Sequence, residues 1–509
     1  MRTLRHTAGM AVLAAGLIAG AATAQTAGQG SGVHATVIGT LPAPQQSCVV
    51  SVQDVSGWRS AYGFGPPDGA TFDDATVCNF YKWGAQMFLW LTSRGPTGDY
   101  IFISPEFYNG ISDGKGGFVL EQNVAGDDNV VESKTVFSLR SVKPLDIENG
   151  QAVPLDSVGQ AGGGGVLISQ AGSLVYYSIH VNDIFASLWL TKDKVPYYNT
   201  PPQGQPVGTF PLSAEQVTEI STATGMTFPE PGAMGLELKA SWVDAASVDP
   251  ALLASMLTIN ASVPQFVKVS DTQWTWDGTA TEDKVLALVG MHVVGSVAGH
   301  PELVWATFEH LRNTEDATWS YVDQSGGVQT VPFDQNAAGR VFFAAGTAAG
   351  AGNVERATAT GKNLPAGVAL AINAKDGQTI GPVSTVRVNP WGNIQPATPT
   401  ATDPVVANNT ELLSLALSVD AALAVVSPQT AMVQGAYLQI GSIWTQHGTI
   451  PNQQPSSDFK GSLTLANSTM ETFHQNLHCF TCHSIGQTDP GTDVSHVFPS
   501  VSAVTTAKK

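Results

Sequence analysis

"KVLALVGMHVVGSV" (residues 284–297) is the stretch of this 509-residue chain that most directly decides its fold. It is rich in Val and other apolar residues that favour strands. "LVWATFEHL" (303–311) has the same character, as has "LVYYSIHVNDIF" (174–185). "GLELKASWVD" (235–244) alternates apolar and polar residues, as a half-buried strand does. We therefore predict a strand in each of these four stretches.

Helical patterns are fewer than strand patterns. "CNFYKWGAQMFLWLTS" (78–93) has apolar residues at helical spacing, and we interpret it as a core helix. A Thr/Pro-rich connector at 397–404 is followed by three further predicted helices, at 408–427, 428–444 and 467–478. The pattern therefore changes from strand-rich to helix-rich at about residue 400.

The predicted fold class is α+β. A large β-rich body is expected at residues 25–400, and a helical C-terminal section at residues 401–509. Hydrophobic residues make up 43% of the chain and charged residues 13%, which is typical of a folded protein. The formal net charge of −18, with no basic stretch, argues against a general nucleic-acid binder.

The first 24 residues have the pattern of a secretory signal peptide. Arg2 and Arg5 precede an apolar run that ends in Ala22-Thr23-Ala24, and we place the cleavage after Ala24. A membrane anchor is the alternative, but the apolar run is too short to span a bilayer. We see no other transmembrane pattern. The mature protein is therefore expected to be periplasmic or secreted, without a membrane span.

Cys48 and Cys78 are predicted to form a disulfide. Such bonds persist in the compartments to which exported proteins are sent. The bond would tie the N-terminal arm to the predicted helix at 78–93. The alternative is a pair of buried free thiols.

The other two cysteines lie in "HCFTCHS" (478–484), near the end of the chain. Cys479, Cys482 and His483 match the c-type haem attachment pattern C-x-x-C-H. Two intervening residues put both thiols on one helical turn, where each can add to one of the two haem vinyl groups. The adjacent imidazole then becomes the proximal iron ligand. The motif therefore predicts one covalently attached haem c.

Three other interpretations of the motif remain open. A thioredoxin-like redox pair also has the C-x-x-C spacing, although it usually follows a strand in a βαβ unit. A structural zinc site could combine the two cysteines with His474 or His478. A local disulfide between the cysteines is the third alternative. Export favours haem, because c-type haem is attached outside the cytoplasm.

The chain resembles a poorly characterised family of exported bacterial monohaem c-type cytochrome proteins, which have a large N-terminal body and a C-terminal C-x-x-C-H. The resemblance implies haem c on Cys479 and Cys482, with His483 as axial ligand, and implies no particular substrate or reaction. It rests on "YKWGAQMFLWLTS", "GLELKASWV", "LVGMHVVGSVAGHPELVWATFEHLRN", "VRVNPW" and "LANSTMETFHQNLHCFTCHS".

The sixth position of the iron would decide the chemistry. No methionine follows His483, so the usual downstream ligand of a small cytochrome c domain is missing. His496 could loop back over the distal face, and we predict it as the distal ligand. The other candidates are Met470, His474, His292, His300 and His310.

Three functions are consistent with these features. The first is electron transfer, with a redox partner protein or a small-molecule electron donor or acceptor. The second is a haem-dependent oxidoreductase whose body forms a substrate pocket over the iron. The third is a binding protein that haem merely stabilises. The chain has no recognisable hydrolase, metalloprotease or nucleotide-binding motif, which favours the first.

Overall fold

The computed structural model describes residues 41–113, 117–124, 161, 164–201, 203, 206–452, 457–486 and 489–506, together with the backbone of 145–148 and 151–154. The predicted signal peptide, residues 1–24 with cleavage after Ala24, lies outside the described residues.

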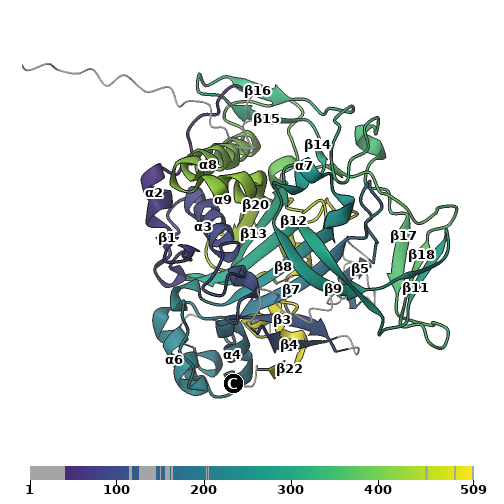
Figure 1. Ribbon diagram of the computed structural model, residues 1–509. Helices are drawn as coiled ribbons and strands as arrows, with labels where there is room; N and C mark the ends of the chain where they lie inside the picture. The colour runs from purple at the N-terminus through teal and green to yellow at the C-terminus, as the bar shows by residue number, and fades with distance from the viewer. Residues whose placement is uncertain are drawn as a thin grey trace, which may run out of the picture.

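One large sheet forms the centre of the molecule (Figure 1). The pairs along it are antiparallel, except that the two strands at one end of the order, β4 and β22, run parallel. Another strand, β9 (Thr258–Pro264), pairs with the first half of β12. The order across the sheet is β21 (Phe459–Gly461), β20 (Tyr437–Thr445), β13 (His300–His310), β12 (Thr281–Val297), β8 (Leu236–Asp244), β7 (Tyr176–Asn182), β3 (Phe107–Ser112), β4 (Phe118–Gln122) and β22 (Val501–Thr505).

The four strands predicted from the sequence are confirmed. Three of them are β8, β12 and β13, in the middle of the sheet. The fourth, 174–185, contains β7 but continues as helix α4 (Asp183–Thr191), because the Asn182 side chain accepts a hydrogen bond from Phe185 N and caps the helix. β12 and β13 form a hairpin whose turn includes Gly299, with φ of +82°.

Both faces of β12 are covered closely. A Cβ added at Gly295 would lie 2.8 Å from the ring of Trp83, which belongs to helix α3 (Val77–Leu91). A Cβ at Gly290 would lie 2.6 Å from Thr469 Oγ1 and 2.9 Å from Asn467 Nδ2. These two glycines are an odd number of residues apart in a strand, so they face opposite sides. Helix α3 therefore packs on one face, and the chain around 467–469 packs on the other.

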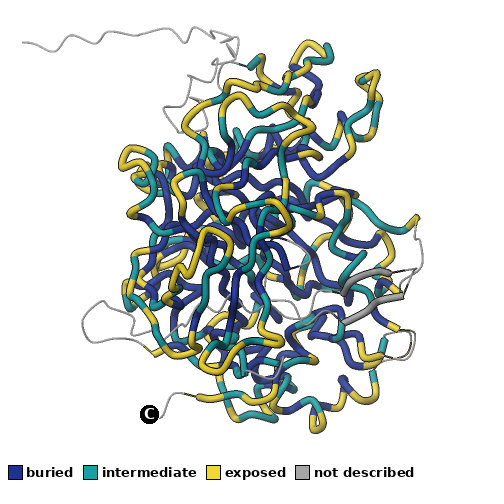
Figure 2. Tube along the Cα trace, turned by 90° about the vertical axis from the view of Figure 1, so that its right-hand side faces the viewer, coloured by how far each residue is buried: buried dark blue, intermediate teal, exposed yellow. Residues whose placement is uncertain are grey.

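Helix α8 (Pro404–Val426) confirms the predicted helix at 408–427, and α3 confirms the one at 78–93. Among the described residues, α8 is the one helix long and apolar enough to cross a membrane, with a hydropathy of 1.4. However, 56% of its apolar window is buried, where α8 contacts α3 and β20. This is the behaviour of a core helix, and Figure 2 shows buried segments throughout the middle of the molecule.

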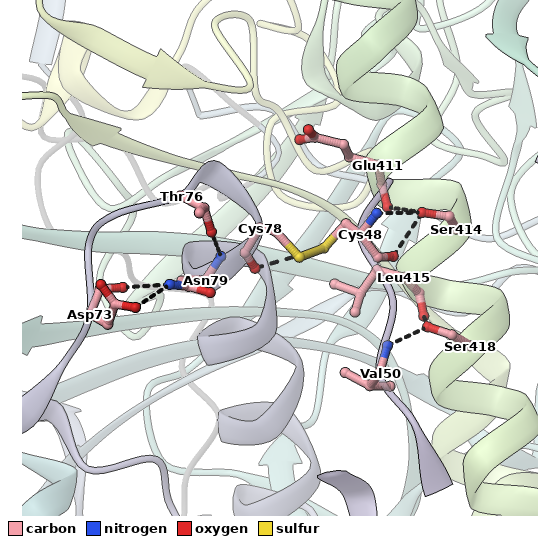
Figure 3. The surroundings of a disulfide bond; sticks show 10 residues. All are labelled: Cys48, Val50, Asp73, Thr76, Cys78, Asn79, Glu411, Ser414, Leu415 and Ser418. Atoms are coloured by element: carbon pink, nitrogen blue, oxygen red, sulfur yellow. Dashed lines mark hydrogen bonds between the residues drawn. A yellow bond between two sulfur atoms is a disulfide. The ribbon is translucent and has the colours of Figure 1, made fainter. Parts of the chain in front are cut away.

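The predicted disulfide between Cys48 and Cys78 is confirmed (Figure 3). The two Cα atoms are 5.4 Å apart. Cys48 N donates to Ser414 Oγ (3.1 Å), which in turn donates to Cys48 O (2.7 Å), and Val50 N donates to Ser418 Oγ (3.0 Å). The N-terminal arm therefore runs along α8 and is covalently tied to α3.

The helix predicted at 428–444 is wrong. A short helix, α9 (Pro428–Val433), is followed by β20, whose nine residues are all buried. β20 pairs with β13 on one side and with β21 on the other. The spacing of apolar residues over so short a stretch fits a buried strand as well as a helix, and here pairing with the distant strand β13 decides between them.

The helix predicted at 467–478 is also wrong, since this stretch consists of turns. Its polar residues bond to the sheet: Asn467 Nδ2 donates to Thr307 Oγ1 (2.9 Å), and Ser468 N donates to Glu309 Oε1 (2.7 Å). Asn and Ser hydrogen bonds of this kind compete with helix formation. The β-rich body is thus confirmed, but apart from α8 and short helices of four to six residues, α9 and α10, the C-terminal section contributes strands and turns.

A smaller sheet and several short elements complete the fold. The smaller sheet has the order β10 (Val267–Ser270), β11 (Gln273–Trp276), β18 (Leu370–Ala374) and β17 (Ala357–Thr360), and lies to the right in Figure 1. The two-stranded ribbons are β1 (Arg59–Ser60) with β2 (Gly63–Phe64), β5 (Leu145–Glu148) with β6 (Gln151–Pro154), β14 (Glu315–Asp316) with β19 (Val386–Arg387), and β15 (Trp319–Val322) with β16 (Val328–Val331). The other α-helices are α2 (Val52–Gly57), α5 (Pro196–Asn199), α6 (Ala214–Thr224), α7 (Pro250–Leu253) and α10 (Cys479–Cys482).

Candidate functional site

The C-x-x-C-H motif forms a single helical turn, α10. Thr481 N donates to His478 O (2.9 Å) and His483 N donates to Cys479 O (2.7 Å), which closes the turn. Cys479 and Cys482 are both free and half-buried, so they do not form the local disulfide considered above. The spacing therefore places both thiols on one turn, as covalent haem attachment requires.

The His483 imidazole is oriented by a backbone carbonyl. Its Nδ1 lies 2.8 Å from Val494 O, so Nδ1 carries the proton and donates this hydrogen bond. The lone pair then resides on Nε2, to which no described residue hydrogen-bonds. Metal-binding histidines are commonly fixed in this way, with one ring nitrogen donating to a carbonyl and the other facing the metal.

Two aromatic rings hold the His483 ring in place. Trp305, on β13, has its ring centroid 4.2 Å from that of His483, and the His496 centroid is 4.1 Å away with the planes 21° apart. Burial, and then the neighbouring His496, lower the pKa of His483 well below its usual value. The imidazole is therefore neutral at physiological pH, which is the form that binds metals.

His496 lies against His483 and is itself engaged. Its Nε2 donates to the carbonyl oxygen of Cys482 (3.0 Å) while its ring stacks on that of His483. To bind iron as the predicted distal ligand, the His496 ring would have to leave the stack and give up this hydrogen bond. That assignment stays a prediction.

A charged cluster on the sheet face lies beside the motif. Lys239 on β8 is paired in register with His292 on β12, and His292 Nε2 lies 3.1 Å from Glu471 Oε1. Burial lowers the pKa of Lys239, and the charges of Glu471 and Cys482 offset part of this lowering. Burial would raise the pKa of Glu471, but His292 and Lys239 outweigh it and lower that pKa. The cluster therefore keeps ionisable groups close to Cys482 in a largely buried setting.

The motif does not fit a thioredoxin-like redox pair. Burial raises the pKa of both Cys479 and Cys482, and the nearby Glu471 raises them further. Reactive redox cysteines have a lowered pKa instead. In addition, α10 follows turns rather than a strand.

A structural zinc site is not supported either. Within the part of the chain that the structure describes, no group of three or more His, Cys, Asp and Glu side chains is placed to hold a metal ion. His474 is exposed, and His478 packs against the ring of Phe459 at a centroid distance of 5.2 Å.

The remaining candidates for the sixth ligand are placed as follows. His292 lies near the motif, as described above. His300 is buried with its Nδ1 2.8 Å from Glu302 Oε1, and His310 Nε2 lies 3.2 Å from Ser255 Oγ. Met470 belongs to a separate apolar cluster that includes Leu167. The structure thus engages His300, His310 and Met470 elsewhere.

The residues present fit a covalently attached haem. Two free thiols on one turn and a neutral imidazole with an available Nε2 are the donor set that haem c uses. Comparison with family models, curated proteins and solved structures gives no match to this chain.

Sequence reasoning missed Lys239, Trp305 and Glu471 as neighbours of the motif. The alternation in "GLELKASWVD" was interpreted as a strand with one solvated face. In the structure, Glu237 on that face accepts a hydrogen bond from Ser495 Oγ of the C-terminal chain. One sequence feature indicates that this face is covered by other parts of the chain. A Lys and a Glu lie on the same face of the strand, although the chain has few charged residues.

Proposed function

We propose that this chain is an exported monohaem c-type cytochrome that transfers electrons through one covalently attached haem c. The observation that carries the proposal is the hydrogen bond from His483 Nδ1 to Val494 O, within a C-x-x-C-H turn whose thiols are free. Export itself rests on the signal-peptide pattern of residues 1–24.

Each residue of the motif has a role in this proposal. Cys479 and Cys482 form the thioether bonds, and His483 provides the proximal nitrogen. Val494 keeps the Nδ1 proton in place, which makes Nε2 the ligating atom. Trp305 and His496 restrain rotation of the imidazole by packing on its faces. When bound, the haem supplies a one-electron change at iron.

The motif is close enough to the surface for electron exchange. Cys479, Cys482 and His483 are all half-buried rather than fully enclosed. A redox partner protein, or a small-molecule donor or acceptor, can therefore approach this part of the molecule. This supports electron transfer as the primary candidate.

A haem-dependent oxidoreductase is the second candidate, and one observation favours it. Lys239, His292 and Glu471 form a charged cluster beside the motif, and an electron carrier has no need of such groups. Buried ionisable side chains next to a cofactor can hold or deliver protons during substrate chemistry.

Absorption spectra of the oxidised and reduced protein, with and without carbon monoxide, distinguish the two candidates. The protein should be produced in cells that carry out cytochrome c maturation. A low-spin spectrum that carbon monoxide leaves unchanged is expected for the electron carrier. A high-spin, carbon monoxide-binding spectrum would favour the oxidoreductase, and protein without haem absorption would contradict both.

A further inference from the structure

A cleft of about 580 Å³ lies where the end of β8 and the start of β12 meet the arm formed by β10 and β11. This volume falls within the range of pockets that bind small molecules. Asp244 lines the cleft, whereas Lys239, five residues earlier on the same strand, lies beside the motif. Five residues of strand span roughly 16 Å, so the cleft is a separate site.

Aromatic side chains form part of the cleft lining. Trp274 comes from β11, Phe266 directly precedes β10, and Tyr176 begins β7. The indole Nε1 of Trp274 is buried, and it has no hydrogen-bond partner among the described residues. Because this nitrogen is not exposed, Trp274 can contribute its aromatic ring, rather than its N–H, to a ligand in the cleft.

Charged side chains form another part of the lining. Lys284 Nζ lies 2.8 Å from Asp244 Oδ2 and 3.2 Å from Glu282 Oε2, so it bridges the two carboxylates. Burial by itself lowers the pKa of Lys284, but these two carboxylates outweigh it and raise that pKa. The side chains remain partly exposed, at 20% for Lys284, 22% for Asp244 and 37% for Glu282. Both carboxylates can therefore accept further hydrogen bonds from a ligand.

The cleft carries charges of both signs. Asp244 and Glu282 are paired with Lys284, and Lys268, which also lines the cleft, pairs with Asp271 at 2.7 Å. An organic cation would be repelled by the lysines, and an anion by the carboxylates. A purely apolar ligand would leave the ionic groups desolvated without new partners, which is costly. A neutral ligand with many hydroxyl groups avoids all three penalties.

We propose that this cleft binds a neutral saccharide. The apolar faces of sugar rings suit Trp274 and Phe266. Sugar hydroxyls can donate to the carboxylates of Asp244 and Glu282, and a sugar oxygen can accept from Lys284. The inference is independent of the haem, because no residue of the cleft belongs to the motif.

Isothermal titration calorimetry of the full-length mature protein tests this proposal. The probes are maltose, cellobiose, lactose and N-acetylglucosamine, with glucosamine and glucose 6-phosphate as charged comparisons. Saturable binding of at least one neutral sugar is expected, and tighter than that of either charged sugar. Trp274→Ala and Glu282→Gln should each weaken that binding about tenfold or more, as loss of one stacking or hydrogen-bonding contact implies.

Matched variants outside the cleft provide the controls. Trp189→Ala removes a tryptophan from α4, and Glu355→Gln removes the partner of Lys375 in a surface ion pair. Both should bind as the parent does. Circular dichroism establishes that each variant is folded. If Trp274→Ala does not fold, Glu282→Gln still tests the proposal. Absence of binding to all four neutral sugars, preference for a charged sugar, or unchanged affinity in a folded cleft variant would each overturn the proposal.

Discussion

Nδ1 of His483 lies 2.8 Å from the carbonyl oxygen of Val494, eleven residues further along the chain. This contact joins the C-terminal end of α10 to the turn η8 (Gly491–Val494). It selects one tautomer of the imidazole and leaves Nε2 for a ligand. Because the acceptor is a backbone carbonyl, this hydrogen bond does not depend on the chemical nature of the side chain at position 494.

The motif cysteines should be required for covalent haem. Replacing Cys479 and Cys482 with Ala removes both thioether bonds, so haem-stained bands should disappear from denaturing gels. Cys48→Ala with Cys78→Ala is the matched control, because it also removes two sulfurs but leaves the motif intact. Staining of the motif variant at the level of the parent would exclude thioether attachment.

His496→Phe should separate the two roles considered for His496. Phenylalanine keeps an aromatic ring for the stack on His483 but cannot bind iron. The hydrogen bond from His496 Nε2 to Cys482 O favours a packing role, so we expect the spin state of the oxidised protein to be unchanged in its absorption spectrum. A change from low-spin to high-spin, with new carbon monoxide binding, would instead establish His496 as the distal ligand.

Loss of the Cys48–Cys78 disulfide should lower the free energy of unfolding. The cysteines are 30 residues apart in sequence, and closing a loop of that size contributes about 3.6 kcal/mol in the chain-entropy model. Urea unfolding of the double Ser variant measures the loss. Ser418→Ala, which removes only the hydrogen bond from Val50 N, should cost far less. Equal costs would mean that the arm is held by α8 rather than by the disulfide.

Asp183 should make stability fall as the pH rises. Burial, together with the nearby Glu106, raises the pKa of Asp183 from 3.8 to about 7. Between these values the native state holds a proton that the unfolded state has released, so the free energy of unfolding decreases with pH. The total decrease is on the order of 4 kcal/mol, at about 1.4 kcal/mol for each pH unit.

Asp183→Asn removes this dependence. Its free energy of unfolding should exceed that of the parent above pH 7, and the difference should shrink toward pH 4. Asp193→Asn, an exposed carboxylate just beyond the same helix, is the control and should follow the parent. Parallel curves for Asp183→Asn and the parent would contradict the raised pKa.

A fragment of residues 401–509 should not fold on its own. β20 pairs with β13, β22 pairs with β4, and Ser468 N donates to Glu309, and all of these partners lie outside the fragment. Far-ultraviolet circular dichroism should therefore show little strand content, and limited proteolysis should degrade the fragment quickly. A cooperative thermal transition would instead show that the C-terminal section is an independent domain.

The sequence predicted the strands with local signals and missed the contacts made over long distances. The β-branched and alternating stretches identified β8, β12 and β13 because a strand in the middle of a sheet needs those residues whatever its neighbours are. The stretch at 437–445 mixes apolar residues with Gln439, Ser442 and Thr445, and its pairing with β13 and β21 makes it a strand. Likewise, Asn467 and Ser468 form buried hydrogen bonds to the sheet in place of the helix predicted at 467–478.

The candidate site was predictable where its chemistry is local. Cys479, Cys482 and His483 are adjacent in sequence, so their spacing alone indicated a shared role. Trp305 and Val494 reach His483 through the fold, and no local pattern marks either residue as its neighbour.

The place of β20 in the sheet has a consequence for the order of assembly. During synthesis, β13 is complete long before Tyr437–Thr445 appears, so the edge of β13 that pairs with β20 is at first unpaired. All eleven residues of β13 are buried in the finished protein. An open apolar edge invites pairing with other chains, and a truncated chain would retain it permanently. Cys479 and Cys482 follow β20 in the chain, so they are also undocked while β20 is being made. If haem is attached as proposed, this interval is the time in which an attaching enzyme would reach the two thiols before the C-terminal segment docks.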